Sequence, residues 1–404
     1  MSGSSSANPD QRFVTGMTAL RRIVVAGASQ AGLASAAALR GFGFDGEIIM
    51  IGDENHRPYT RPPLSKGVLL GAESEESVFL DGTADDVTLR TSTRAVGLDC
   101  SSRLVTLEDG ERVSSDGLII ATGVRARRVD SGAHRGEITL RTLDDAVAVR
   151  DRLVEAEHVS VVGGGFLGME IASSAVKLHK VVTVVDQVRP LIAHLGPVLA
   201  DMCLMAADDH SVKVRLADGG VELGFDGDLP RRVLGVDHTV IAEGDLVITA
   251  AGDVPNTEWL SGSGVRVEDG VLVDDCCRVA PGIVAAGEVV SAPASGNARG
   301  RRPHWWNALR QARIAAGTLL GCGTEATAGD SAVPFFWTEI FGLNIRIAGK
   351  LAPLGEPIVI EGSVADRRAL LVWPANHEGF GTAVSVNFPI SVAKLTRLAN
   401  QPST

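Results

Sequence analysis

Two glycine-rich segments of the chain have the residue types and spacing of turns that bind a pyrophosphate. The first covers residues 27–32 (GASQAG) and the second covers residues 163–168 (GGGFLG). In a G-x-G-x-x-G turn the first glycine permits the tight bend, the second lets the backbone approach the phosphates, and the third lets the helix pack on the strand. The helix that follows offers free N–H groups and a positive dipole to the anion. The two segments therefore predict two dinucleotide sites in one chain.

The first turn lies between elements that would position it. Residues 22–26 (RIVVA) predict a strand, an alanine-rich helix follows to residue 39, and residues 47–51 predict a second strand that leads to Asp53 and Glu54. An acid about 20 residues after such a turn accepts hydrogen bonds from ribose hydroxyls. Ser29 stands at the middle-glycine position, so its side chain either crowds the pyrophosphate or donates a hydrogen bond to it.

The second turn keeps all three glycines. A strand over residues 158–162 precedes it, a helix follows to about residue 178, and a strand over residues 181–185 leads to Asp186. A carboxylate at this position favours a free ribose 2′-hydroxyl and repels a 2′-phosphate, which indicates NADH. Arg189 lies three positions further on and leaves NADPH open.

The composition excludes several classes of protein. The chain has 404 residues and a net charge of −11, which disfavours binding to nucleic acid and to anionic membranes. No apolar run reaches the length that spans a bilayer, and the first twenty residues lack the apolar segment of a signal peptide. The five cysteines show no metal-ligand spacing, so no metal site is expected, and a reduced, cytoplasmic protein is the simplest interpretation.

Apolar strands and glycine turns recur along the chain and predict the domain organisation. Residues 118–123 (LIIATG) and 246–252 (LVITAAG) each form an apolar strand that ends in a small-residue turn, and the pattern changes to short aromatic strands from about residue 326. We predict an α/β fold with two interleaved Rossmann-type domains and a C-terminal α+β domain. The ranges are 1–19 for a flexible extension, 20–126 with 245–325 for the first domain, 127–244 for the second, and 326–404 for the third.

Longer motifs give the chain a family resemblance. They are residues 51–69 (IGDENHRPYTRPPLSKGVL), 304–313 (HWWNALRQAR) and 335–339 (FFWTE), besides the two turns. From about residue 21 to residue 398 the chain resembles the FAD-dependent, NADH-linked ferredoxin reductases of bacterial oxygenase systems, of the putidaredoxin-reductase and biphenyl-dioxygenase-reductase type. These reductases have a glutathione-reductase-like fold.

The resemblance implies two cofactors, FAD on the first Rossmann unit and NADH on the second. The residues implied for FAD are Gly27, Ser29, Ala31, Gly32, Asp53 or Glu54, Arg61, Lys66, Gly287 and Glu288. The strand-end residues Ala121, Thr122, Gly123 and Gly252 are also expected to bind a cofactor. The residues implied for NADH are Gly163, Gly165, Phe166, Leu167, Gly168, Glu170 and Asp186. Trp305 or Trp306 would lie over the region where flavin and nicotinamide meet.

The resemblance also implies an electron-transfer enzyme with Lys66 and Glu170 as catalytic residues. Lys66 would lie near the reactive N5 edge of the flavin and stabilise negative charge there, and Glu170 would face the nicotinamide and pair with Lys66. Electrons would then pass to an iron–sulfur ferredoxin that serves a cytochrome P450 or a Rieske oxygenase. No C-x4-C motif lies near the first turn, which excludes dithiol chemistry of the glutathione-reductase kind.

Four departures from the family pattern keep two alternatives open. They are Ser29 in the first turn, Glu288 in place of an aspartate that grips the ribitol, Pro303 in place of glutamate, and Phe388 in place of arginine. One alternative is a diverged FAD-dependent oxidoreductase that acts on a small molecule or on oxygen. The other is a redox-responsive binding protein of the apoptosis-inducing-factor kind with little turnover.

A group of arginines predicts where the ferredoxin docks. Ferredoxins are acidic, so this acidic chain needs a local basic surface to attract one. Arg301 and Arg302 precede the HWWN motif, and Arg310 and Arg313 follow it. We expect these four to form the docking surface; the alternative is a solvated arginine-rich loop. The sequence leaves a monomer and a homodimer equally open.

Overall fold

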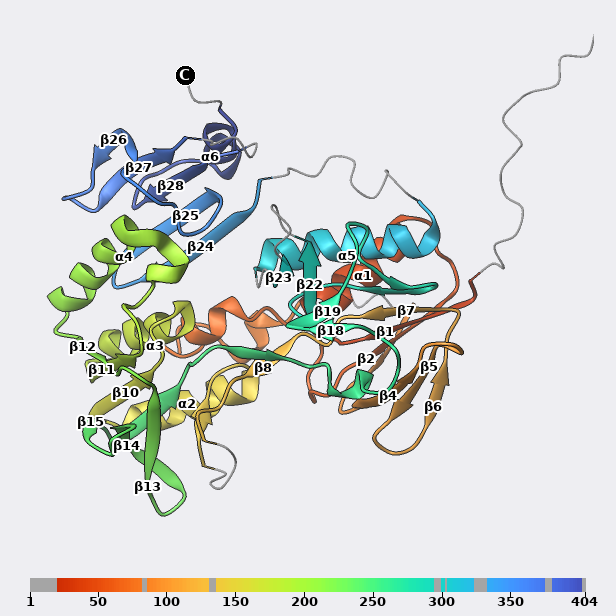
Figure 1. Ribbon diagram of the computed structural model, residues 1–404, viewed down its shortest axis with the longest axis horizontal. Helices are drawn as coiled ribbons and strands as arrows, with labels where there is room; N and C mark the ends of the chain where they lie inside the picture. Colours follow the sequence, from red (N-terminus) through yellow and green to blue (C-terminus); the bar gives the residue numbers. More distant parts are fainter. Residues whose placement is uncertain are drawn as a thin grey trace, which may run out of the picture.

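The computed structural model describes residues 20–81, 86–130, 136–293, 299–301, 304–322, 333–374 and 380–401. The chain forms three parts, with the first and second Rossmann units on the right and left of Figure 1 and the C-terminal part at the upper left. The extension expected over residues 1–19 lies outside the described residues.

The first unit is built on a six-stranded sheet that confirms the interleaved arrangement. Its strands in spatial order are β20 (Arg278–Ala280), β21 (Ile283–Ala285), β7 (Gly117–Ile120), β1 (Arg22–Ala26), β2 (Glu47–Ile51) and β3 (Val87–Arg90). All neighbours pair in parallel except β20 with β21. The chain therefore leaves this sheet after β7, builds the second sheet, and returns at β20.

Alternating β-branched residues bury both faces of this sheet. On one face Ile23, Val25 and Met50 pack against α1 (Gln30–Gly41) and α5 (Trp305–Leu320). On the other face Val24 and Ile49 pack against an antiparallel meander of β4 (Ala95–Asp99), β5 (Leu104–Leu107) and β6 (Arg112–Ser114). When both faces of a strand are buried, nearly all of its residues are apolar, and β1 and β2 have such continuous apolar runs.

The second unit has a five-stranded parallel sheet. Its order is β12 (Lys213–Leu216), β11 (Val181–Asp186), β10 (His158–Val162), β16 (Leu246–Thr249) and β9 (Ile138–Thr139). The helices α2 (Leu143–Glu155), α3 (Phe166–Lys177) and α4 (Ile192–Asp209) share its core on one face. The sequence analysis placed residues 245–325 in the first domain. β16 lies in this range but pairs with β10, so it belongs to the second sheet and that boundary is wrong for it. An apolar LVIT strand suits either sheet, so local sequence could not decide its partner.

Smaller sheets complete the units and connect them. The meander β13 (Val221–Asp226), β14 (Leu229–Gly235) and β15 (Val240–Glu243) packs on the other face of the second sheet. Two antiparallel strands, β8 (Val124–Ala126) and β17 (Asp253–Pro255), carry the chain out of the first unit and back into it. A further sheet consists of β18 (Val267–Glu268), β19 (Gly270–Leu272), β22 (Val290–Pro293) and β23 (Arg299–Gly300).

The C-terminal part is an antiparallel sheet with one helix, as the aromatic strand pattern predicted. Its strands in order are β24 (Phe335–Ile340), β25 (Leu343–Gly349), β28 (Thr382–Val386), β27 (Arg368–Trp373) and β26 (Ile358–Ser363). The helix α6 (Val392–Ala399) buries Leu395 against this sheet.

One segment of the first unit joins the core of the other two. The RPPLSK region buries Tyr59, Leu64 and Leu69 in the same apolar cluster as α2, α3 and the C-terminal sheet. The three parts are therefore packed together through the segment that carries the most specific sequence motif.

The described helices include none with both the length and the apolar character needed to cross a bilayer. Within the same residues, no group of three or more His, Cys, Asp and Glu side chains could hold a metal ion.

Candidate functional site

Close backbone packing requires the outer glycines of the first turn. Gly27 has a φ of +125°, and a Cβ atom there would lie 2.0 Å from the carbonyl oxygen of Ala121. A Cβ atom on Gly32 would lie 1.9 Å from the carbonyl oxygen of Gly27. Ser29, the non-glycine residue of this turn, accepts a long hydrogen bond of 3.4 Å from Arg61 Nη2, so its hydroxyl points toward that guanidinium.

The second turn has the same packing and an open middle position. Gly163 has a φ of +110°, and its Cβ atom would lie 2.3 Å from the carbonyl oxygen of Ala250. A Cβ atom on Gly168 would likewise lie 1.9 Å from the carbonyl oxygen of Gly163. A Cβ atom on Gly165, in contrast, would meet only His194 Cε1 at 3.7 Å, an ordinary contact. The backbone at this position is therefore accessible to a ligand.

The helices that follow the two turns begin with uncapped N–H groups. Neither Ser29 at the start of α1 nor Gly165 at the start of α3 gives a side-chain cap, and the same is true of α4 and α5, whereas Thr142 caps α2 and Ser391 caps α6. Uncapped N–H groups at a helix N-terminus suit a phosphate. The glycine packing and these open helix ends fit one dinucleotide on each sheet.

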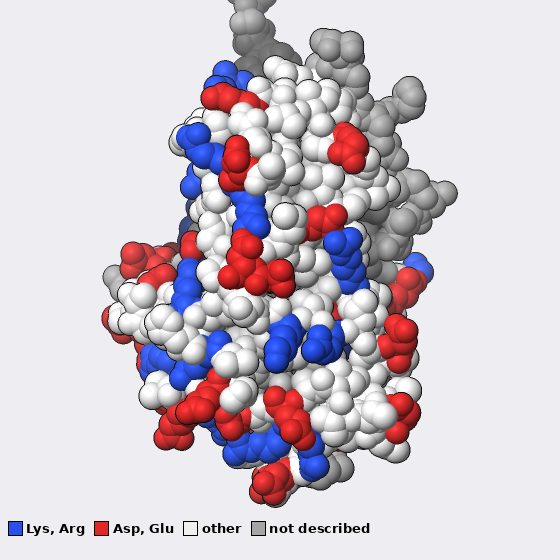
Figure 2. All heavy atoms as spheres, turned by 90° about the vertical axis from the view of Figure 1, so that its left-hand side faces the viewer, with Lys and Arg blue, Asp and Glu red and all other residues white. Residues whose placement is uncertain are grey.

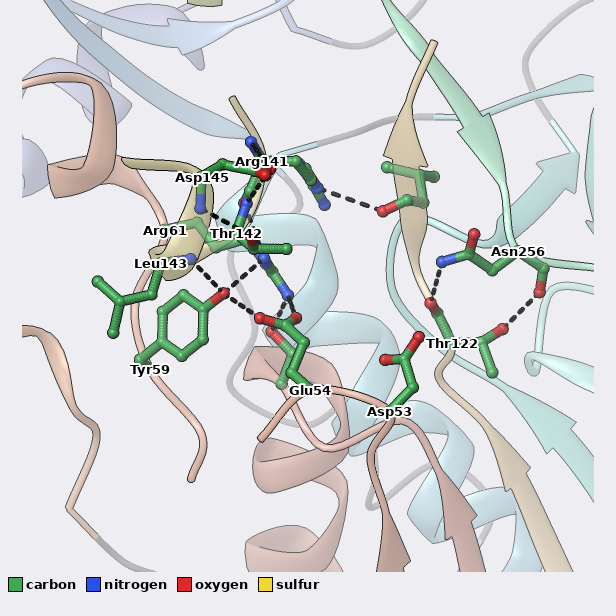
Figure 3. A network of polar contacts seen from close by, with 12 residues as sticks. Asp53, Glu54, Tyr59, Arg61, Thr122, Arg141, Thr142, Leu143, Asp145 and Asn256 are labelled. Atoms are coloured by element: carbon green, nitrogen blue, oxygen red, sulfur yellow. Dashed lines mark hydrogen bonds and ion pairs between the residues drawn. The ribbon is translucent and has the colours of Figure 1, made fainter. Parts of the chain in front are cut away.

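The other small residues implied for the cofactors lie at the carboxyl edges of the same sheets. Thr122, just after β7, donates from Oγ1 to the carbonyl oxygen of Asn256 at 2.8 Å, and Asn256 Nδ2 donates back to the carbonyl oxygen of Thr122 at 2.9 Å (Figure 3). Gly287, after β21, has a φ of +89° and would place a Cβ atom 2.8 Å from that of Ala31. Ala121 and Gly123 also follow β7, Gly252 follows β16, and Leu167 lies in the first turn of α3.

The acids after β2 have different partners, which separates the two candidates for the ribose. Glu54 Oε1 accepts a hydrogen bond of 2.6 Å from Arg61 Nη2, and its other oxygen accepts from the Tyr59 hydroxyl (Figure 3). Asp53 is exposed and has Arg94 at 3.5 Å. Both carboxylate oxygens of Glu54 thus accept hydrogen bonds within the chain, from Arg61 and Tyr59. Asp53 is exposed and is therefore the better candidate to bind a ribose.

Asp186 lies at the carboxyl end of β11, beside the second turn. Its Oδ2 accepts the Gly164 N–H at 2.6 Å and its Oδ1 accepts the Gln187 N–H at 2.6 Å. Arg189, the residue that left NADPH open, forms an ion pair with Asp201. Its charge is therefore partly neutralised within the chain.

Lys66 and Glu170 meet where the three parts of the chain join. Lys66 Nζ lies 2.6 Å from Glu170 Oε2 and donates to the carbonyl oxygen of Pro62 at 3.2 Å. Ser65 Oγ donates to Glu170 Oε2 at 2.6 Å, and Thr338 Oγ1 donates to Glu170 Oε1 at 2.7 Å. Glu170 is buried, so these donors from the first unit and from β24 keep its carboxylate satisfied. The sequence predicted the pair but not the roles of Ser65 and Thr338.

Aromatic side chains surround the start of α3. The Phe166 ring lies 4.3 Å from the Phe336 ring and 5.1 Å from the His194 ring, measured between centroids. Burial lowers the pKa of His194, and the nearby Asp186 only partly opposes this effect. His194 is still exposed, and Phe166 and Phe336 are half-buried, so the group forms an aromatic surface beside the second turn.

The two tryptophans of the HWWN motif both retain exposed surface. Trp305 is 40% exposed and contacts Trp337 of β24 edge-to-face at 5.7 Å, while Trp306 is half-buried. A further residue of the longer 304–313 motif has a role that sequence reasoning missed. Buried Gln311 accepts the Gly287 N–H through Oε1 at 3.0 Å and thus holds the turn after β21.

Glu288 forms an ion pair with Arg141 instead of extending freely from its turn. Burial raises the pKa of Glu288, but Arg141 and Arg61 outweigh this effect and the net pKa lies below the usual range. The longer side chain is therefore drawn toward Arg141, a residue that the sequence analysis did not single out. In the sequence, the only indication of a role for Arg141 is its position two residues before the helix that begins at Leu143.

Two of the four arginines expected at the docking surface, Arg301 and Arg313, contact other side chains of the chain. Arg301 forms ion pairs with Asp253 and with Asp269, the latter at 3.0 Å. The Arg313 guanidinium lies over the Phe42 ring at 4.9 Å, near the end of α1. Arg310, one turn earlier on α5, is partly buried, and its charge acts on the buried Cys277. Arg302 lies outside the described residues.

Comparison with known proteins places this geometry among redox enzymes. Residues 21–312 match the model of the pyridine nucleotide-disulphide oxidoreductase family. The chain is 32% identical to the 3-phenylpropionate/cinnamic acid dioxygenase ferredoxin–NAD(+) reductase component of Photorhabdus laumondii, over 94% of this chain and 96% of the relative. It is 31% identical to the biphenyl dioxygenase system ferredoxin–NAD(+) reductase component of Paraburkholderia xenovorans, over 93% and 92%.

A solved structure agrees with these sequence relatives. The covalent putidaredoxin reductase–putidaredoxin complex contains a chain that matches with a TM-score of 0.82 and 28% identity, over 94% of this chain and 92% of that chain. The family resemblance and the α/β fold class predicted from the sequence are confirmed.

Proposed function

The chain belongs to the pyridine nucleotide-disulphide oxidoreductase family, and from this membership we propose that it is an NADH-dependent flavoprotein reductase. In this proposal it passes electrons from NADH through FAD to a small iron–sulfur ferredoxin that serves a cytochrome P450 or a Rieske oxygenase. The relatives named above are reductase components that work with a ferredoxin.

The observation that carries the proposal is the Lys66–Glu170 pair. Lys66 lies in the segment that follows β2 of the first sheet, and Glu170 lies in α3, the helix that begins at the second turn. The Lys66 Nζ and Glu170 Oε2 atoms are 2.6 Å apart. A site that transfers hydride between two bound nucleotides needs both reacting rings at such a junction, with water excluded.

Each part of the chain has a definite role in this scheme. FAD, when bound, supplies a group that accepts two electrons and releases them one at a time. Lys66 places a fixed positive charge at the junction, and Glu170 holds that ammonium group in place. The half-buried rings of Phe166 and Phe336 lie at the start of α3, where they would cover part of a bound nicotinamide nucleotide from water.

The proposal includes a surface on which the ferredoxin docks. On the described part of the face seen in Figure 2, acidic and basic side chains alternate, so that face offers no continuous positive surface. Arg301, Arg302, Arg310 and Arg313 remain the proposed docking residues. Arg302→Glu is the first charge reversal to test, since a change at Arg301 would also break its ion pairs with two aspartates. If it leaves ferredoxin-dependent cytochrome reduction unchanged at low salt, docking through Arg302 is disproved.

The function is tested by supplying purified holoprotein with NADH and three acceptors. We expect NADH oxidation with ferricyanide, and with ferredoxin plus cytochrome c, at rates well above the rate with oxygen. Turnover with ferricyanide or oxygen but not with any ferredoxin would favour the small-molecule oxidoreductase. Negligible turnover despite full flavin content would favour the redox-responsive binding protein.

Asp186 is expected to set the preference for NADH. In Asp186→Asn the repulsion of a 2′-phosphate is removed, so the ratio of kcat/KM for NADPH to that for NADH should rise about tenfold, which corresponds to about 1.4 kcal/mol. Arg189→Met is the matched control and should leave the ratio unchanged, because Arg189 pairs with Asp201. Steady-state kinetics with both nucleotides measures this, and an unchanged ratio in Asp186→Asn would contradict the assignment.

The proposed compartment is the cytoplasm, where thiols such as the five free cysteines of this chain stay reduced. Burial raises the pKa of the Cys277 thiol to about 12, which makes it unreactive.

A further inference from the structure

The strand β26 forms an uncovered edge of the C-terminal sheet. It pairs with β27 on one side, and within the described part of the chain no strand pairs with its other side. Figure 1 shows β26 at the outer edge of this sheet, at the upper left. All its residues except Ser363 are exposed. Its outer side therefore presents a row of backbone N–H and C=O groups to which another strand can pair.

The side chains of β26 are apolar on both faces of the sheet. Ile358, Val359 and Ile360 are 53%, 46% and 49% exposed. Residues directly opposite in an antiparallel pair share a face, so Ile358 lies on the face of Val372 and Val359 on the face of Leu371. Ile360 is the extra residue of a bulge and has no partner on β27. Three consecutive β-branched side chains thus extend into water beyond the covered part of the sheet.

Other edges of this fold are protected, which makes β26 distinctive. Edge strands avoid pairing by carrying charged side chains, lysine above all. The edge strand β12 of the second sheet follows this rule with Lys213 and Arg215. β26 has one charge, Glu361, and the bulge at Ile360 is its other feature that disfavours pairing. It keeps apolar side chains where β12 has charges, which is expected of an edge that a partner covers.

A second copy of β26 fits this edge. Two antiparallel copies related by a two-fold axis at Val359 pair Val359 with Val359 and Ile358 with Ile360. In the same register Glu361 lies opposite Pro357 of the other copy, so no two like charges are paired. A register centred on Glu361 would instead place two carboxylates opposite each other. The charge pattern of the strand therefore favours the register that buries its three apolar residues.

Other occupants suit this edge less well. A ferredoxin is acidic, and β26 offers it no basic residue but the carboxylate of Glu361. Residues 1–19 join the described chain beside β1, which lies on the right of Figure 1, whereas β26 lies at the upper left. At the other end of the chain residues 402–404 follow the described part, too few to pair along the six residues of β26.

We propose that the protein is a homodimer in which the two β26 strands pair antiparallel about a two-fold axis at Val359. The two C-terminal sheets then form one continuous sheet across the dimer. The Lys66–Glu170 pair lies against β24, the opposite edge strand, so pairing through β26 leaves both sites free. The inference does not depend on the proposed function, and monomer and dimer should have the same turnover per flavin with ferricyanide.

Opposite charges at Val359 test the two-fold axis. By sedimentation velocity the wild-type holoprotein should be a dimer, and Val359→Lys and Val359→Glu should each be a monomer. Each variant places two like charges opposite each other, so the Kd of the dimer should rise at least about 100-fold. An equimolar mixture of the two should form a dimer again, because opposite charges then face each other. The matched control is Val240→Lys, at a comparably exposed valine of the edge strand β15, and it should stay dimeric.

Disulfide cross-linking gives a second measurement, which a misfolded variant would not reproduce. Residues that face each other in an antiparallel pair have Cα atoms about 4.5–5.5 Å apart, a distance that a disulfide spans. The background is Cys276→Ser, because Cys276 is exposed. In it Val359→Cys should give a covalent dimer with diamide, which takes up the two electrons and two protons that the thiols lose. Val240→Cys should give none.

The outcomes decide the proposal. A wild-type protein that stays monomeric at every concentration would disprove it, and so would a dimer that persists in both Val359→Lys and Val359→Glu. If the two variants are folded, with wild-type Tm and flavin content, and their mixture stays monomeric, the axis at Val359 is wrong. Dissociation of Val240→Lys would place the interface elsewhere. A wild-type dimer without NADH turnover would overturn the proposed function alone.

Discussion

Lys66→Met should slow the bleaching of the flavin by NADH by about 10²- to 10³-fold. Lys66 is the cation at the junction of the two nucleotide units, and its Nζ lies 2.6 Å from Glu170 Oε2. Removal of one preorganised group that stabilises developing charge in a water-poor site has effects of this size. Methionine keeps most of the side-chain length, so the packing around it changes little. Stopped-flow absorbance under anaerobic conditions measures the rate per bound flavin.

The double variant Lys66→Met/Glu170→Gln separates catalysis from stability. Glu170 is buried, and the single change leaves its carboxylate without a counter-ion, which destabilises a protein by about 3–5 kcal/mol. Glutamine removes the charge and still offers an oxygen to the Thr338 hydroxyl. We expect the double variant to recover thermal stability but not the rate. If the single variant is bleached at the wild-type rate per flavin, the role given to Lys66 is wrong.

Gly163→Ala should destabilise the second unit, whereas Gly165→Ala should leave its stability nearly unchanged and weaken the binding of NADH. The new methyl group of Gly163→Ala would lie 2.3 Å from the Ala250 carbonyl oxygen at a φ of +110°, so the second unit should be severely destabilised. The strain in φ alone contributes about 1–3 kcal/mol. At Gly165 the φ is −72° and the methyl group meets only His194 at an ordinary distance. That variant should keep the wild-type Tm within a few degrees.

The affinity for NADH gives the second half of this comparison. The methyl group of Gly165→Ala would stand where a pyrophosphate approaches the start of α3, so the Kd for NADH should rise at least about tenfold. Thermal unfolding and NADH titration of both variants measure the two effects. Wild-type affinity in Gly165→Ala would show that the nucleotide does not bind at this turn.

Local sequence predicted the nucleotide units well for a physical reason. The strands Arg22–Ala26, Glu47–Ile51 and His158–Val162 have the same bounds in the structure as in the sequence analysis. Each is a β-branched run that leads into a turn, and such patterns depend on residues a few positions apart. The glycines that the turns require are also local, because φ and close backbone approach allow little else.

Side-chain partnerships were harder to predict because they join residues far apart in the chain. The sequence could not choose between Asp53 and Glu54, and the choice depends on Arg61 and Tyr59, which hold Glu54. It grouped Arg301 with the docking arginines, whereas the fold brings Asp253 and Asp269 to its guanidinium.

The sequence by itself determined the two glycine turns, the acids after them and the RPPLSK motif, and with these the family and the kind of chemistry. Only the tertiary structure decided that Glu288 turns to Arg141, that Ser65 and Thr338 satisfy Glu170, and that β16 joins the second sheet. The reason is that backbone conformation follows from neighbouring residues, whereas an ion pair or a strand partner depends on which distant segments the packed core brings together.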